Sequence, residues 1–251
     1  MRDVPSMLAG LSPMPNTDFS AFGPVELEPL SKIQRLTGAF LGRNWVTIPH
    51  VTHHDEVDVT TLEEWRATWN ATHPEAKLTP VAPLVKAMAI ALAENPRFNT
   101  ALSADGMQIV RKGYVHIGVA VDTPRGLLVP VIRDADRKTV REIGAELAEL
   151  AARARDKGLP MAAMEGGCIT LSSLGHIGGT AFTPIINAPE VAVLGALAIQ
   201  ERPFRGSGGD IAWAKRLPLS LSYDHRVING ADAARFVQSI GRAFADPALL
   251  I

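Results

Sequence analysis

The segment LSLSYDHRVINGADAARF, residues 219–236, concentrates the residue types that could do chemistry. Leu219, Leu221 and Tyr223 alternate with polar residues, which predicts a strand with one apolar face. His225 falls on that apolar face at the strand end, where a partly desolvated and immobile imidazole could act as a general base. A core histidine satisfied by a backbone carbonyl is the alternative, and spacing alone leaves both interpretations open.

The residues around His225 have structural interpretations as well. Asn229 and Gly230 predict a tight turn before a helix, because both residue types tolerate positive φ. Asp224 and Arg226 alternate to the opposite face of the strand. We expect those two charges to pair with neighbouring groups.

A second candidate is the segment ITLSSLGHIGGTAFTPIINAPE, residues 169–190. A predicted strand leads into Ser172, and Gly175, Gly178 and Gly179 allow close backbone approach. The serine hydroxyl could donate to a developing oxyanion, or the glycines could cradle a phosphate. The segment contains no G-x-G-x-x-G, G-K-[ST] or G-x-S-x-G pattern, so a plain glycine-rich turn between strands stays open.

A third cluster contains His50, His53, His54, Asp55 and Glu56, which are residue types that bind metals. On a strand these side chains divide between two faces, and the sequence has no H-E-x-x-H pattern or cysteine cluster to complete a ligand set. We therefore expect no metal, and a metal site on this segment is a weaker alternative.

The composition excludes several classes of protein. The chain has 251 residues, 25 Lys and Arg, 26 Asp and Glu, and a net charge of −1, which argues against a dedicated nucleic-acid binder. Its 47% hydrophobic content is typical of a globular protein. Cys168, the single cysteine, excludes an intrachain disulfide, and no apolar run is long enough to cross a membrane. With a poor secretion signal, a soluble cytoplasmic protein is expected.

The chain divides into two unequal parts. Residues 1–30 hold five of the 18 prolines and show no helical periodicity, which predicts an extended arm or linker. Residues 31–251 form the predicted catalytic domain. Its first helix should run over 31–42, because Ser31 and Gln34 make a capping box; a strand over 45–60 should follow, with Pro49 at a sheet edge or bulge.

Further helices are predicted from start signals at Thr61, at Thr79–Pro80 and at Thr139. A final helix should bury an apolar stripe formed by Ala233, Val237, Ile240 and Phe244. Apolar strands are predicted over 114–122, 127–133, 168–175 and 191–199. Helices and strands mix without a regular βαβ rhythm, so we expect an α+β fold with helices packed on a large mixed sheet.

Four blocks of the sequence resemble one known family. IPHVT, GVAVDTPRGLLVPVIRDAD, ITLSSLGHIGGTAFTPIINAPEVAVLG and SLSYDHRVING occur in the order typical of dihydrolipoamide acyltransferases, the core components of 2-oxo acid dehydrogenase complexes. The resemblance covers about residues 25–251. GHIGGTAFTP and LSLSYDHRVING look most like the pyruvate-type, acetyl-transferring branch.

This resemblance implies a fold and a set of roles. The fold would be the two-layer sandwich of chloramphenicol acetyltransferase, assembled as a homotrimer with active sites between subunits, or as a larger cubic or icosahedral core built from trimers. His225 would be the general base and Ser172 the oxyanion donor. Asn229 stands where many members have Asp in the D-H-R-x-x-D-G pattern. Because an amide cannot ionise, Asn229 would have a hydrogen-bonding or positioning role instead of acting as a charged carboxylate. Arg66 is the candidate for an arginine partner from the first half of the chain.

The implied reaction moves an acyl group between dihydrolipoamide and coenzyme A, which are substrates, without a metal. Acetyl is the expected group; succinyl or branched acyl groups and a non-catalytic assembly core are the alternatives. Cys168 would be a buried strand residue rather than a nucleophile. Expected partners are a lipoyl domain and the decarboxylase and dihydrolipoamide dehydrogenase components. No lipoyl-lysine motif precedes residue 30, so we expect the lipoyl group on a removed domain or another chain.

Overall fold

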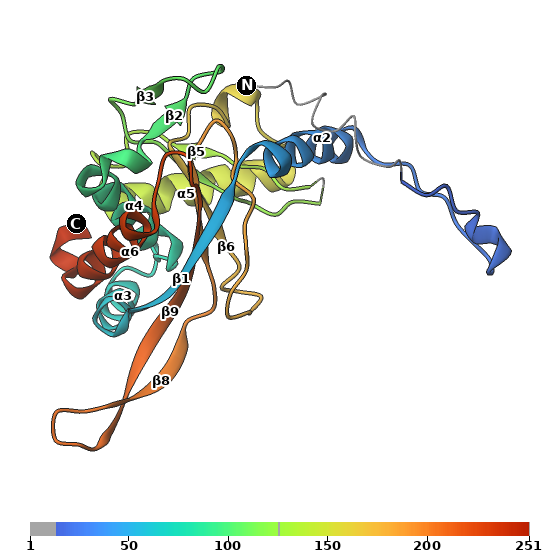
Figure 1. Cartoon of the computed structure of the whole chain (residues 1–251). Coiled ribbons are helices and arrows are strands. Elements are labelled where there is room, and N and C mark those ends of the chain that lie inside the picture. The colour runs from blue at the N-terminus through green and yellow to red at the C-terminus, as the bar shows by residue number, and fades with distance from the viewer. Residues whose placement is uncertain (1–13, 125, 251) are drawn as a thin grey trace.

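The computed structural model describes residues 14–124 and 126–250. Within them, helices pack against a seven-stranded mixed sheet in the order β1-β9-β7-β6-β4-β5, with β8 pairing to β9 (Figure 1). A separate two-stranded sheet joins β2 to β3. The strands are β1 His50–Asp58, β2 Thr100–Leu102, β3 Ile109–Arg111, β4 Ile117–Val119, β5 Val131–Ile132, β6 Ile169–Ser173, β7 Ala192–Ala196, β8 Gln200–Arg205 and β9 Ile211–Asp224.

The α-helices are α2 Lys32–Thr47, α3 Thr60–Thr72, α4 Val81–Glu94, α5 Val140–Asp156 and α6 Gly230–Ala245. Single turns of 3₁₀ helix lie at Phe19–Ala21, Pro96–Phe98, Met161–Ala163 and Pro247–Leu250. Two of the predicted start signals are confirmed in full. Ser31 and Thr139 each accept a hydrogen bond from the N3 backbone amide, and Gln34 and Glu142 reach back to complete the capping boxes.

Several predicted boundaries were wrong; the strands expected over 114–122 and 127–133, for example, are shorter, at Ile117–Val119 and Val131–Ile132. The strand expected from residue 45 begins only at His50, because α2 continues to Thr47. Asn44 is buried in that last helical turn and donates to the carbonyl oxygen of Ile186 at 2.9 Å, a tertiary contact that outweighs the local strand preference. Helix α3 begins at Thr60 rather than after Thr61. Helix α4 begins at Val81, so its N-cap is Pro80 rather than the expected Thr79, and no side chain caps it.

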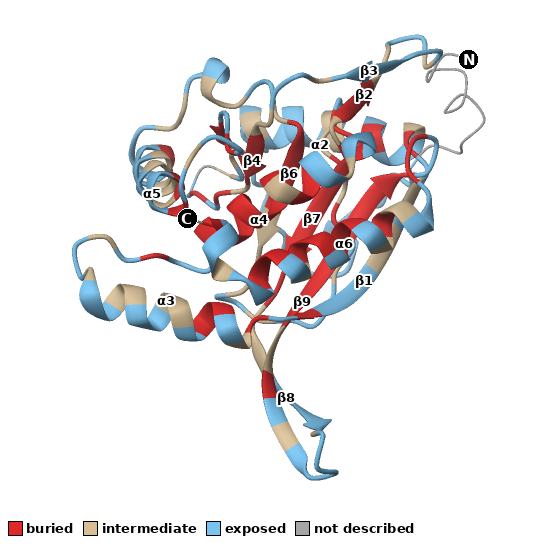
Figure 2. Cartoon of the chain, turned by 90° about the vertical axis from the view of Figure 1, so that its left-hand side faces the viewer, coloured by how far each residue is buried: buried red, intermediate tan, exposed pale blue. Residues whose placement is uncertain are grey.

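The main core lies between the sheet and the helices. Helix α4 is buried along most of its length and contacts both α5 and α6 (Figure 2). Helix α6 turns Ala233, Val237, Ile240 and Phe244 into this core, as its periodicity predicts. The α+β fold class is therefore confirmed.

Two parts project from this body. The β8–β9 hairpin extends beyond the helical layer with Ile211 and Trp213 largely exposed (Figure 2). Residues 14–30 are exposed and lead away from the sheet. Residues 1–13 of the predicted arm lie outside the described residues, so the domain boundary at residue 30 stays a prediction. No helix in the described part of the chain is long and apolar enough to cross a membrane.

Candidate active site

His225 directly follows the last residue of β9. Its backbone amide donates to the carbonyl oxygen of Pro49 at 3.1 Å, and its ring lies against Tyr223 with centroids 5.8 Å apart. The side chain is exposed in the single chain. The expectation of a desolvated imidazole on the apolar face, and its core-histidine alternative, were wrong for one isolated chain, because the strand alternation stops at Asp224 and the turn carries the ring out of the core.

An ion pair with one buried partner, Asp224, fixes the turn that carries His225. Asp224 is 3% exposed, and its carboxylate accepts hydrogen bonds from the backbone amide, Nε and Nη2 of Arg226 at 3.0, 2.9 and 2.6 Å. The same carboxylate raises the pKa of the Arg226 guanidinium. The Asp224 carbonyl also accepts from the amides of Val227 and Ile228. The backbone around His225 is thus held from several directions.

Asn229 is the N-cap of α6. Its side-chain oxygen accepts from the backbone amide of Asp232 at 3.0 Å, and the Asp232 carboxylate completes a capping box. Its φ of −104° and the helical position of Gly230 contradict the predicted positive-φ turn. The physical reason is that the helix begins immediately after Asn229, so the segment needs a cap instead of a left-handed turn.

Ser172 lies near the C-terminal end of β6, half-buried, in register with Gly195 of β7. Leu171 points into the helical core, so Ser172 points to the opposite face of the sheet. A Cβ on Gly195 would lie 2.5 Å from the Phe182 ring, which therefore packs directly beside the Ser172 position. Phe182 belongs to residues 174–189, which we call the covering segment.

The covering segment contains the predicted glycine-rich turn. Gly178 and Gly179 have φ values of +127° and +94°, a region that favours glycine. A Cβ on Gly175 would lie 3.1 Å from the Leu197 carbonyl oxygen, so the expected close backbone approach is confirmed there. Within the described residues these glycines serve chain reversal and packing.

The structure places Ser172 and His225 at opposite ends of the sheet. Strand β6 runs parallel to β7, whereas β7 runs antiparallel to β9, so the C-terminal ends of β6 and β9 face opposite directions. Ser172 pairs in register with Gly195 of β7, and Gly195 pairs in register with Ser220 of β9. His225 lies five residues after Ser220 in the sequence. At ~3.4 Å per residue, about 17 Å separate the two along the strand direction. One chain alone does not bring them to one reacting carbonyl.

Glu190 is a buried carboxylic acid that the sequence reasoning missed. It is 5% exposed, and the Thr170 hydroxyl donates to it at 2.6 Å. Burial raises the pKa of the Glu190 carboxyl to about 7, against the lowering effect of the Thr170 hydrogen bond. No local pattern in the sequence marks this residue, because its burial depends on β6 lying beside the start of β7.

The weaker candidates have other partners. Both ring nitrogens of His50 are engaged with backbone groups, and no group of three or more His, Cys, Asp or Glu side chains in the described residues is arranged to hold a metal. Arg66, the arginine suggested as a partner, pairs with Glu63 on its own helix and donates to the Leu78 carbonyl, so its guanidinium is held by groups of the first half of the chain. Cys168 is fully buried, which raises the pKa of its thiol and disfavours the reactive thiolate.

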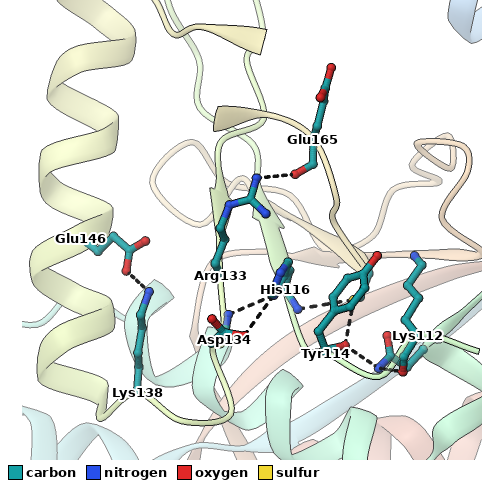
Figure 3. Close-up of polar contacts among 10 residues, drawn as sticks. Lys112, Tyr114, His116, Arg133, Asp134, Lys138, Glu146 and Glu165 are labelled. Carbon is teal, nitrogen blue, oxygen red and sulfur yellow. Dashed lines mark hydrogen bonds and ion pairs between the residues drawn. The ribbon is translucent and has the colours of Figure 1, made fainter. Parts of the chain in front are cut away.

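A polar cluster at the β4–β5 edge does not include His225 or Ser172. Lys138 pairs with Glu146, and Arg133 donates to the Glu165 carbonyl at 3.1 Å (Figure 3). The amide of Asp134 donates to Nδ1 of His116 at 3.0 Å. A cavity of about 320 Å³ lies nearby. Lys138 and His116 thus have carboxylate partners within the chain, and Arg133 bonds to backbone carbonyls.

Comparison with known proteins identifies the family. The sequence model described as 2-oxoacid dehydrogenases acyltransferase (catalytic domain) matches residues 23–251. The chain belongs to this family. Within the described residues, the match spans the seven-stranded sheet, the α-helices and the three candidate residues Ser172, His225 and Asn229.

Named acyltransferase relatives agree with this assignment. The chain is 51% identical over 240 residues to the dihydrolipoyllysine-residue acetyltransferase component of the pyruvate dehydrogenase complex of Pseudomonas aeruginosa, covering 95% of this chain and 44% of that protein. The Bacillus subtilis component of the same name is 40% identical over 242 residues, covering 96% and 54%. The chain thus spans only about half the length of these relatives.

Solved structures of the family share the fold. A dihydrolipoamide acetyltransferase from Azotobacter vinelandii superposes with a TM-score of 0.92 at 48% identity, covering 96% of this chain and all of that one. The cubic core of a pyruvate dehydrogenase multienzyme complex gives 0.91 at 49% identity, with coverage of 96% and 100%. A chloramphenicol acetyltransferase gives 0.58 at 15% identity, covering 82% and 95%, which confirms the predicted fold class.

Proposed function

We propose that this chain is the catalytic domain of a dihydrolipoamide acetyltransferase, which moves an acetyl group between dihydrolipoamide and coenzyme A. Family membership and the names of the relatives support the reaction class. The observation that carries the proposal is a matched set of three residues. The Azotobacter vinelandii structure accompanied a study of a serine, a histidine and an asparagine in its catalytic mechanism, the asparagine four residues after the histidine. Ser172, His225 and Asn229 supply the same types in the same order.

His225 acts as the general base in this proposal. A free thiol has a pKa of about 8.5, so it is mostly protonated at neutral pH. Because the thiolate is the nucleophile, a base must remove the thiol proton. A neutral imidazole accepts the thiol proton as the sulfur attacks the thioester carbonyl, and then returns a proton to the leaving sulfur. The Asp224–Arg226 pair and the Asn229 cap hold the backbone on both sides of that ring.

Ser172 stabilises the tetrahedral oxyanion by donating its hydroxyl hydrogen. Because it lies about 17 Å from His225 along the sheet, the hydroxyl and the imidazole at one site come from different subunits. A homotrimer with three such interfaces satisfies this requirement, since every copy contributes one of each. The exposed ring of His225 then becomes desolvated at the interface. Similarity to the cubic core of a pyruvate dehydrogenase complex supports a larger assembly of trimers.

The wider setting follows from the relatives. They are components of pyruvate dehydrogenase complexes, so we propose a lipoyl domain, a decarboxylase component and a dihydrolipoamide dehydrogenase component as partners, in the cytoplasm. Succinyl or branched acyl groups are the alternative substrates. A non-catalytic core of the same fold is the alternative function, and the presence of both Ser172 and His225 favours the enzyme.

A transfer assay tests the proposal. The purified chain is mixed with free dihydrolipoamide and acetyl-, succinyl- or isobutyryl-coenzyme A, and release of coenzyme A is followed. We expect fastest turnover with the acetyl thioester. If the protein assembles properly but turns over none of the thioesters, the proposed transferase activity is contradicted and the non-catalytic core is favoured.

A further inference from the structure

His50 opens β1 beside the turn that carries His225. In the β1–β9 ladder His50 is paired with Asp224. The residue before His50 is Pro49, whose carbonyl oxygen accepts a hydrogen bond from the amide of His225 at 3.1 Å. The His50 side chain is half-buried and lies against the Trp45 ring, 5.5 Å away. This histidine therefore belongs to the same end of the sheet as His225, although it takes no part in the proton transfer described above.

The two nitrogens of the His50 ring have opposite and defined roles. Nδ1 lies 2.8 Å from the carbonyl oxygen of Ile48, and Nε2 lies 3.0 Å from the amide nitrogen of Ile186. A carbonyl only accepts and an amide only donates, so the ring carries its hydrogen on Nδ1 and a lone pair on Nε2. The Nε2 lone pair accepts the hydrogen bond from the Ile186 amide, although Ile186 lies 136 positions away in the sequence.

Ile186 anchors the covering segment above the sheet. Its carbonyl accepts from the Asn44 side chain at 2.9 Å, and its side chain packs in a small cluster with Ile48 and Val193. Its amide is held by His50. Both backbone polar groups of Ile186 are thus bonded to side chains of α2 and β1.

This anchor reaches the Ser172 position through Phe182. Four residues before Ile186, the Phe182 amide donates to the Ser220 hydroxyl at 3.3 Å, and its ring packs on Gly195. Gly195 is the in-register partner of Ser172. Any shift of the covering segment therefore changes the packing beside the Ser172 hydroxyl.

We propose that His50 is a positioning residue for acyl transfer: its Nε2 holds the covering segment at Ile186, and the segment in turn holds the surroundings of Ser172. The inference rests on the proposed function, because it assigns Ser172 a part in the reaction. Misplacing a reacting or stabilising group by about 1 Å costs up to ~10²-fold in rate. Loss of the Nε2 acceptor should therefore appear in kcat more than in KM.

Two substitutions separate the two nitrogens. His50→Gln places a side-chain oxygen near the Nε2 position and keeps the acceptor for Ile186. His50→Asn places its amide nitrogen near Nδ1, which keeps the donor for Ile48 and removes the acceptor. His53→Asn, three residues along β1, is the matched control, and Asn44→Ala removes the second anchor of Ile186 from the other side.

Hydrogen exchange at the Ile186 amide and steady-state kinetics are measured on the assembled proteins, with assembly checked by light scattering. We expect His50→Gln and His53→Asn to resemble wild type in both measurements. His50→Asn should lose protection at Ile186 and lower kcat about 10- to 100-fold with little change in KM; Asn44→Ala should lower kcat in the same way.

Several results would overturn the proposal. Wild-type kcat in His50→Asn would do so, and so would equal losses in the Asn and Gln variants or an unprotected Ile186 amide in the wild-type protein. A wild-type protein with a protected Ile186 amide but no turnover would instead contradict the proposed function, so the two failures are distinguishable.

Discussion

The two ends of the central sheet hold their candidate residues by different means. At the β9 end, His225 is fixed mostly by groups close in sequence, the Asp224–Arg226 ion pair and the Asn229 cap, together with one long-range bond from its amide to the Pro49 carbonyl. At the β6 end, Ser172 depends on the covering segment, whose anchors come from α2, β1 and β9. Most of the bonds that hold the His225 turn are thus local, whereas the surroundings of Ser172 are held by tertiary contacts.

The two ends of the sheet should therefore respond differently to mutation. A change at the β9 end should act mainly on proton transfer, because most of the bonds that hold the turn are local. A change at the β6 end should also move the covering segment and its packing on β7.

Replacement of His225 by alanine should have the largest effect on turnover. Removing a general base costs about 10²–10⁴-fold in rate. The residue is exposed in the single chain, so the helical content and melting temperature should stay close to wild type. Steady-state turnover with light scattering as the assembly control checks this, and wild-type turnover would refute the assignment of the base.

Ser172→Ala should lower kcat by about 10²–10³-fold, the usual cost of one oxyanion donor. KM should change little, because the hydrogen bond strengthens mainly in the transition state. Kinetics with varied acetyl-coenzyme A measure both constants. A large increase in KM at constant kcat would make Ser172 a substrate-binding residue instead.

Glu190 should make stability depend on pH. Its pKa is about 7 when folded and near the ordinary 4.5 when unfolded, so between these values the folded state holds a proton that the unfolded state has released. Stability is full below pH 4.5 and falls as pH rises to about 7, by on the order of 3 kcal/mol. Urea unfolding from pH 5 to pH 8 should show this fall, and Glu190→Gln should remove most of it. An unchanged slope in the variant would contradict the assignment.

Gly195→Ala should cause the smallest loss and should act at the β6 end. The added methyl group would lie 2.5 and 2.6 Å from two carbons of the Phe182 ring, and overpacking of this kind costs about 1–3 kcal/mol. Urea unfolding measures the loss. Gly241→Ala on α6, where the nearest atom to the added methyl group would be 3.4 Å away, is the matched control. Equal free energies of unfolding in the two variants would show that the Phe182 ring moves aside without loss of stability.

Much of the fold could be predicted from local patterns. The capping boxes at Ser31 and Thr139, the apolar stripe of α6 and the alternation of β9 all involve residues within a few positions of one another, so sequence spacing reports them directly. The extension of α2 to Thr47 could not be predicted, because Asn44 meets Ile186 across 142 positions.

The sequence nominated candidate residues but could not give their arrangement. Position and the family resemblance pointed to His225, Ser172 and Asn229, whose catalytic roles stay proposals. The exposure of His225 depends on the strand ending at Asp224, and the distance to Ser172 depends on β9 running antiparallel to β7. Glu190 and the bond from His50 to Ile186 carry no local signal, since each joins segments that meet only in the folded sheet.

The most direct test of a site shared between subunits is complementation of two inactive variants. Ser172→Ala and His225→Ala chains are co-assembled in equal amounts, and the turnover of the mixed oligomer is compared with that of each variant alone. If the hydroxyl and the imidazole come from different subunits, random mixing leaves about a quarter of the interfaces with both residues intact, and about a quarter of wild-type turnover should return. A mixed oligomer no more active than its parents would contradict the account.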